Sequence, residues 1–304
     1  MTKEHPFANA NFLSYGSLIL GILCLSFSPL FTHWADAPGI VTSFYRMVIA
    51  IGVLTPFMIF NYSKNQGEIK KIPLRWFIFP MAAGVFSAFD HAFWGSAIKA
   101  ANVANATLLN YIAPLWVSLI AILVFRERYK KIYWLGLILV FIGALAVMDF
   151  LRGGAAQFVF MGEGFALISS VFYAGYFLLT QKGRGYFAAV QQLWVSLLAC
   201  GITLGIIVLV LKLPLTGYSQ ATYLNFILAA LISQLLGYYG ITYSLGKIPA
   251  SIVSPSLTLQ PVITSVLAIP FANQSLSVGQ ILGGILVLVG VLLVNRSPHL
   301  QHDG

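Results

Sequence analysis

Apolar residues dominate the chain in ten long runs, which short polar segments separate. Each run holds about 18 residues or more, the length that an α-helix needs to cross the hydrocarbon core of a bilayer. The runs do not alternate between apolar and polar residues as the strands of a membrane barrel do. The pattern predicts an all-α integral membrane protein with ten transmembrane helices. The predicted spans are 14–34, 39–60, 75–98, 102–125, 131–149, 162–181, 189–211, 221–245, 249–271 and 277–295.

The composition narrows the class of protein further. Of the 304 residues, 59% are hydrophobic and 8% are charged, and the mean hydropathy is +0.87. A soluble domain is about 25% charged, so soluble enzymes and soluble binding modules are excluded. The formal net charge is +9, but the basic residues form short clusters between the apolar runs. Because that placement is typical of membrane topology, we expect the lipid bilayer and no nucleic acid as a partner.

The basic clusters also predict the orientation of the chain. With the N-terminus placed inside, the inner segments hold 13 Lys and Arg residues and the outer loops hold 3. Lys and Arg favour the cytoplasmic side of a membrane. We therefore predict a multi-pass protein of the cell (inner) membrane with both termini in the cytoplasm. We expect it to be a monomer or a weak dimer.

The two halves of the chain repeat one another at an offset of 147 residues. The predicted repeats, 1–152 and 153–304, hold five spans each, and because five is odd the second repeat enters the membrane from the opposite side. Inverted repeats of this kind are typical of secondary transporters, although a duplicated structural bundle would show the same offset. The matched positions are Pro114, Ser118, Glu127, Gly136 and Gly143 in the first half and Pro261, Ser265, Gln274, Gly283 and Gly290 in the second.

Three segments resemble the EamA family of the drug/metabolite transporter superfamily. They are PGIVTSFYRMVIA (38–50), AANVANATLLNYIAPLWVSLIA (100–121) and FRERYKKIYWLGLILVFIGA (125–144). The resemblance covers both halves and implies a ten-helix secondary transporter, most often an exporter of amino acids or other small metabolites. The second half departs from the family pattern, because Gln274 stands where the family usually keeps a glutamate.

Two charged residues lie deep inside predicted spans, where each is expected to cost about 2.5–3.5 kcal/mol. At 1.5 Å per residue, Arg46 lies about 10 Å and Asp90 about 12 Å from the outer membrane face. Opposite charges at one depth on neighbouring helices predict an ion pair between Arg46 and Asp90. The pair would either brace the two helices or act directly on a substrate or a proton.

Several polar and aromatic side chains share this layer or its surroundings. His91 follows Asp90, Trp94 lies one turn further along the same span, and Asn110 and Tyr111 occupy the next span. A lone histidine in a span is often only hydrogen-bonded to a neighbour, but here it lies beside an acid. At the repeat offset His91 matches Tyr238, so the two are expected to line one cavity from opposite sides. The predicted substrate-binding residues are His91, Trp94, Asn110, Tyr111, Tyr176 and Tyr238.

Prolines and one carboxylate mark candidate moving parts. Pro114 interrupts the predicted helix 102–125, and Pro255, Pro261 and Pro270 interrupt the predicted helix 249–271. A proline there permits either a hinge or a static kink, and Pro114 and Pro261 are the candidate gate residues. Glu127 lies between two arginines at the cytoplasmic end of its helix. A structural salt bridge or helix-end contact is its first interpretation, and inner gating is the second.

The sequence carries no motif for energy coupling or catalysis. It has no GxxxxGK[ST] loop, HExxH or GxSxG motif, and Cys24 and Cys200 lie in separate spans without metal-ligand spacing. We therefore expect no cofactor, no metal and no enzymatic activity. The leading hypothesis is a carrier of neutral or aromatic amino acids that works by alternating access. The alternatives are a carrier of another solute (drug, nucleoside or sugar), an enzyme acting on lipid-linked substrates, or a channel.

Overall fold

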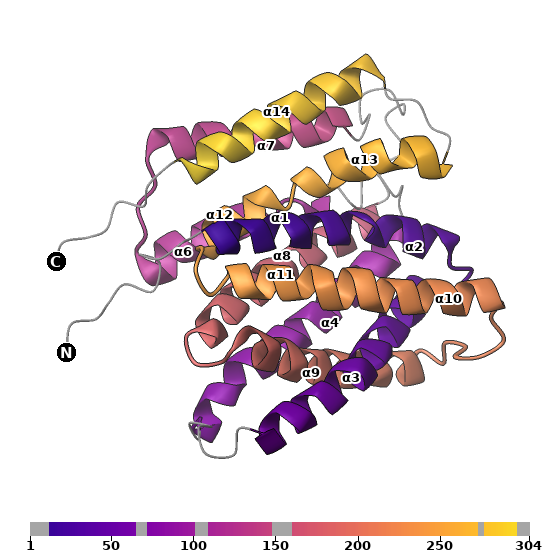
Figure 1. The fold of residues 1–304 in the computed structure, drawn as a ribbon. Coiled ribbons are helices and arrows are strands. Elements are labelled where there is room, and N and C mark those ends of the chain that lie inside the picture. The colour runs from indigo at the N-terminus through magenta and orange to yellow at the C-terminus, as the bar shows by residue number, and fades with distance from the viewer. Residues whose placement is uncertain (1–11, 65–71, 101–108, 148–159, 273–276, 297–304) are drawn as a thin grey trace.

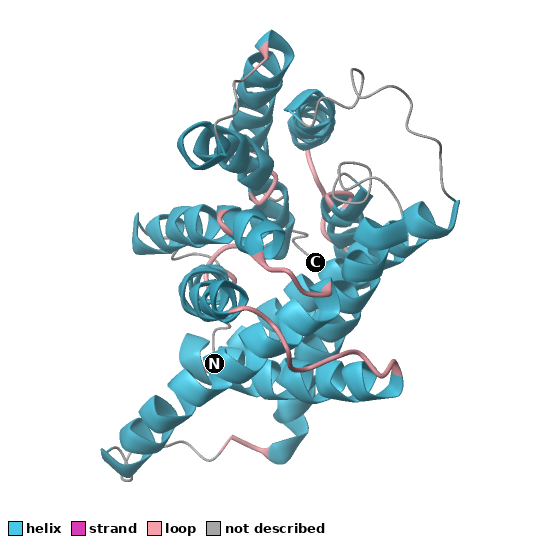
Figure 2. Ribbon diagram, turned by 90° about the vertical axis from the view of Figure 1, so that its right-hand side faces the viewer, coloured by secondary structure: helices cyan, strands magenta, loops and turns pink. Residues whose placement is uncertain are grey.

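The computed structural model describes residues 12–64, 72–100, 109–147, 160–272 and 277–296, and every regular element within them is helical (Figures 1 and 2). Described helices lie within each of the ten predicted spans, which confirms the prediction of an all-helical membrane protein. Seven of the described segments are long and apolar enough to cross a membrane. The prediction of two domains with a boundary at residue 152 falls on 148–159, which lies outside the described residues.

The first half of the chain contributes six α-helices and one 3-10 helix to the described structure. Their bounds are α1 (Phe12–Ser26), α2 (Ser28–Trp34), α3 (Gly39–Lys64), η1 (Leu74–Phe77), α4 (Ile78–Ala100), α6 (Ala113–Phe125) and α7 (Lys131–Val147). The second half contributes seven α-helices and one π-helix. Their bounds are α8 (Phe160–Arg184), α9 (Ala189–Val210), α10 (Gln220–Leu228), the π-helix η2 (Ala229–Gly237), α11 (Tyr238–Ser244), α12 (Ala250–Ser256), α13 (Leu259–Ala272) and α14 (Val278–Asn295).

Glycines bring α7 and α14 into close contact, and the two helices lie side by side in Figure 1. A methyl group at Gly143 would lie 2.6 Å from the carbonyl oxygen of Gly283, and one at Gly290 would lie 2.6 Å from that of Gly136. At the repeat offset Gly136 matches Gly283 and Gly143 matches Gly290. Exchanging the two repeats therefore converts one contact into the other, as an isologous two-fold interface requires. The contact supports two inverted repeats and explains why only glycine fits there.

The third span of each repeat packs against the first span of the other. In the structure α4 lies against α8, while η2 and α11 lie against α1. The second contact again needs glycine, because a methyl group at Gly21 would lie 2.9 Å from the carbonyl oxygen of Gly237. The two repeats are thus interleaved rather than stacked as separate bundles, and the side chains of α3, α4, α8 and η2 meet in the interior.

Two of the predicted continuous spans are broken at matching repeat positions, one in each repeat. A turn at Phe27 also separates α1 from α2 within the first predicted span. A turn at Tyr111 and Ile112 precedes α6, and a turn at Leu257 and Thr258 separates α12 from α13. Pro114 and Pro261 follow the turns at matching positions by two and three residues. A proline has no N–H to donate to the carbonyl four residues earlier, which favours a break in the helix at that point. Pro114 and Pro261 thus lie beside the two interruptions, which fall within one residue of the same repeat position, whereas Pro255 and Pro270 lie inside α12 and α13.

Candidate functional site

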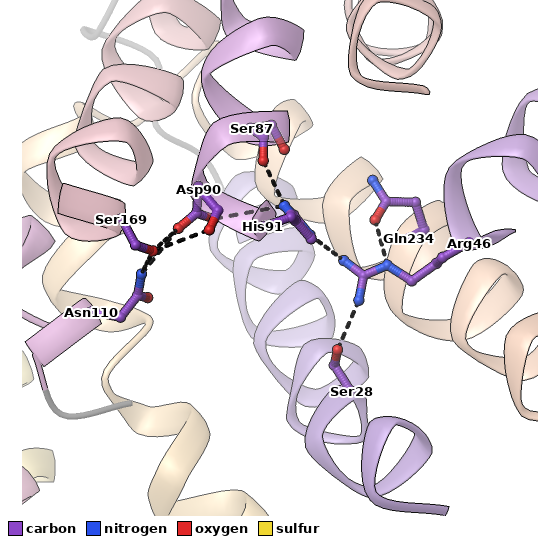
Figure 3. A network of polar contacts seen from close by, with 8 residues as sticks. All are labelled: Ser28, Arg46, Ser87, Asp90, His91, Asn110, Ser169 and Gln234. Atoms are coloured by element: carbon purple, nitrogen blue, oxygen red, sulfur yellow. Dashed lines mark hydrogen bonds and ion pairs between the residues drawn. The ribbon is translucent and has the colours of Figure 1, made fainter. Parts of the chain in front are cut away.

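A buried polar network lies where α3 and α4 meet α8 and η2 (Figure 3). Its charged or titratable members are Arg46 on α3 and Asp90 and His91 on α4. Their exposed fractions are 6%, 7% and 6%, so all three are withdrawn from the surface. The sequence predicted these residues at one depth, and the structure brings them into one network.

His91 is held between Arg46 and its own helix. Its Nε2 lies 2.9 Å from an Nη atom of Arg46, and its Nδ1 lies 2.7 Å from the backbone oxygen of Ser87. A guanidinium only donates hydrogen bonds and a carbonyl only accepts them. Nε2 must therefore accept and Nδ1 must carry the proton, which makes His91 a neutral imidazole with one defined tautomer.

Asp90 points away from Arg46. Its Oδ1 accepts hydrogen bonds from Ser169 Oγ at 2.6 Å and from Asn110 Nδ2 at 3.0 Å, while its Oδ2 lies 3.7 Å from Nδ1 of His91. Asn110 also donates to Ser169 Oγ at 2.6 Å, which closes a triangle of three side chains from three helical segments.

The predicted ion pair between Arg46 and Asp90 is therefore corrected. Consecutive residues of an α-helix point about 100° apart, so Asp90 and His91 cannot both face α3. His91 faces Arg46, and Asp90 faces Ser169 on α8 and Asn110 (Figure 3). Equal depth on two helices predicted proximity correctly but did not fix which side chain faces the partner.

Arg46 has two further hydrogen-bond partners that the sequence analysis missed. Its Nε donates to Gln234 Oε1 at 2.9 Å, and its second Nη donates to Ser28 Oγ at 2.9 Å. Gln234 lies within the π-helix η2, and short π-helical turns occur frequently at functional sites. The repeat offset could have pointed to Gln234. It matches Gln234 with Ser87, one turn before His91, just as it matches Tyr238 with His91.

Aromatic rings border the network on the side of the second repeat. The guanidinium carbon of Arg46 lies 5.9 Å from the ring centre of Tyr238, within the range of a cation–π contact. Tyr238 in turn packs edge-on against Tyr176, with ring centres 5.6 Å apart. The structure thus brings Tyr238, which the repeat offset matched with His91, to the network, and Tyr176 packs beside it.

The other two predicted aromatic residues stand apart from these hydrogen bonds. Trp94 lies one turn beyond Asp90 on α4 and is half-buried, and Tyr111 is half-buried in the turn before α6. Neither side chain joins the hydrogen-bonded network of the described residues, and a substrate contact for them remains a prediction.

A second polar cluster joins the repeats at the end of α6. The Tyr129 hydroxyl donates to a carboxylate oxygen of Glu127, and the Tyr133 hydroxyl lies 2.6 Å from Ser118 Oγ and 3.0 Å from the backbone oxygen of Ser251 in α12. Burial, together with the Glu127 carboxylate, raises the pKa of Tyr129 well above its usual value, so this hydroxyl stays protonated. Glu127 thus belongs to the cluster where α6, α7 and α12 meet. A gating role for Glu127 remains a prediction.

The fold and the network define a class of protein. A membrane-spanning helical chain with two inverted repeats, broken helices and a buried polar network between the repeats has the architecture of a secondary transporter. The chain belongs to the EamA-like transporter family, whose pattern matches it twice, at residues 13–148 and 160–296. It is therefore a membrane transporter by family, and the family is not one of enzymes.

Two relatives agree with this assignment, and a solved structure agrees with the fold. The chain is 23% identical over 284 residues to the "Uncharacterized transporter YxxF" of Bacillus subtilis, covering 91% of this chain and 87% of that one. It is 27% identical over 197 residues to the "Uncharacterized transporter sll1319" of Synechocystis, a match that spans 62% of this chain and 58% of the relative. A crystal structure at 16% identity has a TM-score of 0.76 over 92% of this chain and 96% of that one, which shows the fold alone.

Proposed function

We propose that this transporter exports small metabolites, and neutral amino acids, including aromatic ones, in particular. The observation that carries the proposal is the buried network in which Arg46 and Asp90, of opposite charge, flank the neutral His91. Charged residues at mid-depth in a membrane protein mark substrate or ion pathways by default, because their burial is costly. The rings of Tyr176 and Tyr238 beside them supply the apolar surface that an aromatic or aliphatic side chain requires.

The proposed transport cycle is alternating access around this network. Both repeats carry a broken helix at matching positions, and such breaks let the two halves of a helix move separately. In this proposal Pro114 and Pro261 mark the hinges. Glu127 and its tyrosine partner belong to the cytoplasmic gate, and both termini lie in the cytoplasm.

Counterflow in proteoliposomes tests the proposal. Vesicles are loaded with one unlabelled solute and the entry of the same labelled solute is followed, for a panel of neutral and aromatic amino acids, nucleosides, sugars and a cationic drug. We expect counterflow for neutral amino acids alone, and loss of at least about 90% of it on His91→Ala, because Arg46 then loses a partner. Counterflow of nucleosides, sugars or the drug without any amino acid would refute the proposed cargo.

A control separates transport from folding. Gly52 on α3 has open space around it, so Gly52→Ala leaves the packing intact. This variant and His91→Ala are compared for yield and for elution from a sizing column. A His91→Ala protein that is folded and transports as the wild type does would remove the network from the mechanism.

A further inference from the structure

Arg46 has a buried positive charge, and its hydrogen-bond partners among the described residues are neutral groups. Within the part of the chain that the structure describes, its hydrogen bonds go to Gln234, Ser28 and His91, and the histidine is held neutral by those same contacts. These bonds use three of the five N–H groups of a guanidinium. A buried cation is stabilised when it is paired with an anion, and paired most strongly when a carboxylate accepts two N–H groups side by side. No carboxylate of the described residues bonds to Arg46, so its remaining N–H groups can donate to an anionic group from outside the protein.

Asp90 presents the complementary half of this arrangement. Both of its side-chain donors, Ser169 and Asn110, bind the same oxygen, Oδ1. The other oxygen, Oδ2, lies 3.7 Å from a histidine nitrogen whose proton is already directed to the Ser87 carbonyl. Oδ2 therefore retains its capacity to accept a hydrogen bond from a cation.

The imidazole ring of His91 lies between the guanidinium of Arg46 and Oδ2 of Asp90. Arg46 contacts Nε2 of His91, and Oδ2 of Asp90 lies nearest to Nδ1 of the same ring. A molecule that bears a carboxylate and an ammonium group on one carbon presents opposite charges at a similarly short separation. Neither a sugar nor a neutral nucleoside has that pair of charges.

We propose that this network recognises a zwitterion, with the carboxylate of the cargo on Arg46, its ammonium group on Asp90 and His91 as the spacer between them. This inference rests on the proposed function and names the groups that select the cargo. Asn110 lies directly before the break that precedes α6, so movement of that helix changes the hydrogen bonding of Asp90. Binding of the ammonium group is thereby linked to the moving part of the first repeat.

Matched analogues of two amino acids test the proposal on the wild-type protein in proteoliposomes. The first set is phenylalanine, phenylalaninol, which lacks the carboxylate, and 3-phenyllactate, which lacks the amine. The second set is leucine, leucinol and 2-hydroxyisocaproate. Each analogue competes against counterflow of its parent amino acid. We expect every analogue to compete about tenfold more weakly or worse, because each loses a charge-assisted contact.

Two substitutions then assign the two ends. In Arg46→Gln the parent amino acid should lose its advantage over the amino alcohol and keep its advantage over the hydroxy acid. In Asp90→Asn the reverse should hold. Arg184→Gln is the matched control: this arginine donates to backbone oxygens of Thr242 and Phe187, away from the network, so both ratios should stay as in the wild type.

The outcomes separate this inference from the proposed function. If amino acids are transported but the amino alcohol and the hydroxy acid compete as well as the parent in the wild type, the zwitterion site is refuted and the amino-acid transporter stands. If no amino acid shows counterflow, the proposed function fails and this inference fails with it. Because the wild-type series needs no variant, a substitution that prevents folding leaves the test intact. Folded variants whose ratios both stay unchanged also overturn the assignment.

Discussion

The two repeats share a scaffold but differ in chemistry. The scaffold recurs in both: a broken helix beside Pro114 or Pro261, and reciprocal glycine contacts between α7 and α14. The chemistry does not recur, because Arg46, Asp90 and His91 lie in the first repeat, whereas α9, α10, η2 and α11 carry no charged residue or histidine. In their place the second repeat offers Gln234 and Tyr238, which approach Arg46 from the opposite side.

This difference separates two demands on a transporter. Equivalent helix packing gives the two halves equivalent freedom to move, which alternating access requires. Recognition of one cargo requires a single arrangement of charges, and that arrangement need not obey the two-fold axis. The comparison therefore predicts that scaffold substitutions act alike in both repeats and that substitutions in the network do not.

The largest expected effect is all-or-none and concerns topology. Lys131 and Val278 are the first residues of α7 and α14, are both exposed and differ by the repeat offset. In inverted repeats such equivalent positions lie on opposite sides of the membrane. Val278→Cys should react with a membrane-impermeant maleimide added to intact cells, and Lys131→Cys only after permeabilisation. Reaction of both variants from the same side would contradict the inverted repeats. The wild type is the control, because its native Cys24 and Cys200 are buried.

The next effect is on folding and should be equal in the two repeats. Gly143→Leu and Gly290→Leu each force a side chain into a backbone oxygen of the partner helix. We expect each to lower stability by about 3 kcal/mol, seen as loss of the monodisperse peak in detergent. Gly52→Leu enters open space and should retain the wild-type peak. A large difference between the two glycine variants would contradict the reciprocal contact.

A smaller effect distinguishes the contacts of Asp90. Because Asp90 accepts a hydrogen bond from Asn110 and does not touch Arg46, the cycle of Asp90→Ala with Asn110→Ala should show a coupling of about 1.5–3 kcal/mol. The cycle of Asp90→Ala with Arg46→Gln should show less than about 1 kcal/mol. Thermal or denaturant unfolding in detergent measures both. A larger coupling in the second cycle would restore the direct ion pair that the structure excludes.

The smallest effect compares two matched serines. Ser118 and Ser265 each donate to the carbonyl of the proline four residues before them, but Ser118 also contacts the hydroxyl of buried Tyr133. Ser118→Ala should therefore be about 1 kcal/mol more destabilising than Ser265→Ala, because it removes one partner of a buried hydroxyl. Equal melting temperatures for the two variants would mean that the Ser118 contact adds nothing to stability and that Tyr133 depends on its hydrogen bond to Ser251.

Much of the fold was predictable because the bilayer imposes strong rules. Span length, loop charge and the repeat offset predicted ten helices in two inverted repeats, and Pro114 and Pro261 lie beside two of the breaks. Depth along a helix predicted that Arg46, Asp90 and His91 gather at one level. These inferences use one-dimensional position, which the sequence records directly.

The direction in which each side chain points from its helix could not be predicted in the same way. Asp90 and His91 are neighbours in sequence, and only the packing of α4 against α3 and α8 decides which one meets Arg46. Helix η2 posed a further difficulty, since its π-helical turns shift the direction in which Gln234 points relative to an α-helix. Uncharged partners such as Ser169 and Gln234 carry no charge signal that would have singled them out.

The order of Arg46's partners along the chain has a consequence for biosynthesis. Ser28 precedes Arg46 by 18 residues, His91 follows it by 45, and Gln234 follows it by 188. At about 5–20 residues per second, the ribosome reaches Gln234 roughly 10–40 s after Arg46 has been made. During that interval the first repeat must keep this charged side chain in the bilayer with Ser28 at first, and with Ser28 and His91 once His91 has been made. The first repeat therefore contains hydrogen-bond partners that can stabilise Arg46 before the second repeat is synthesised.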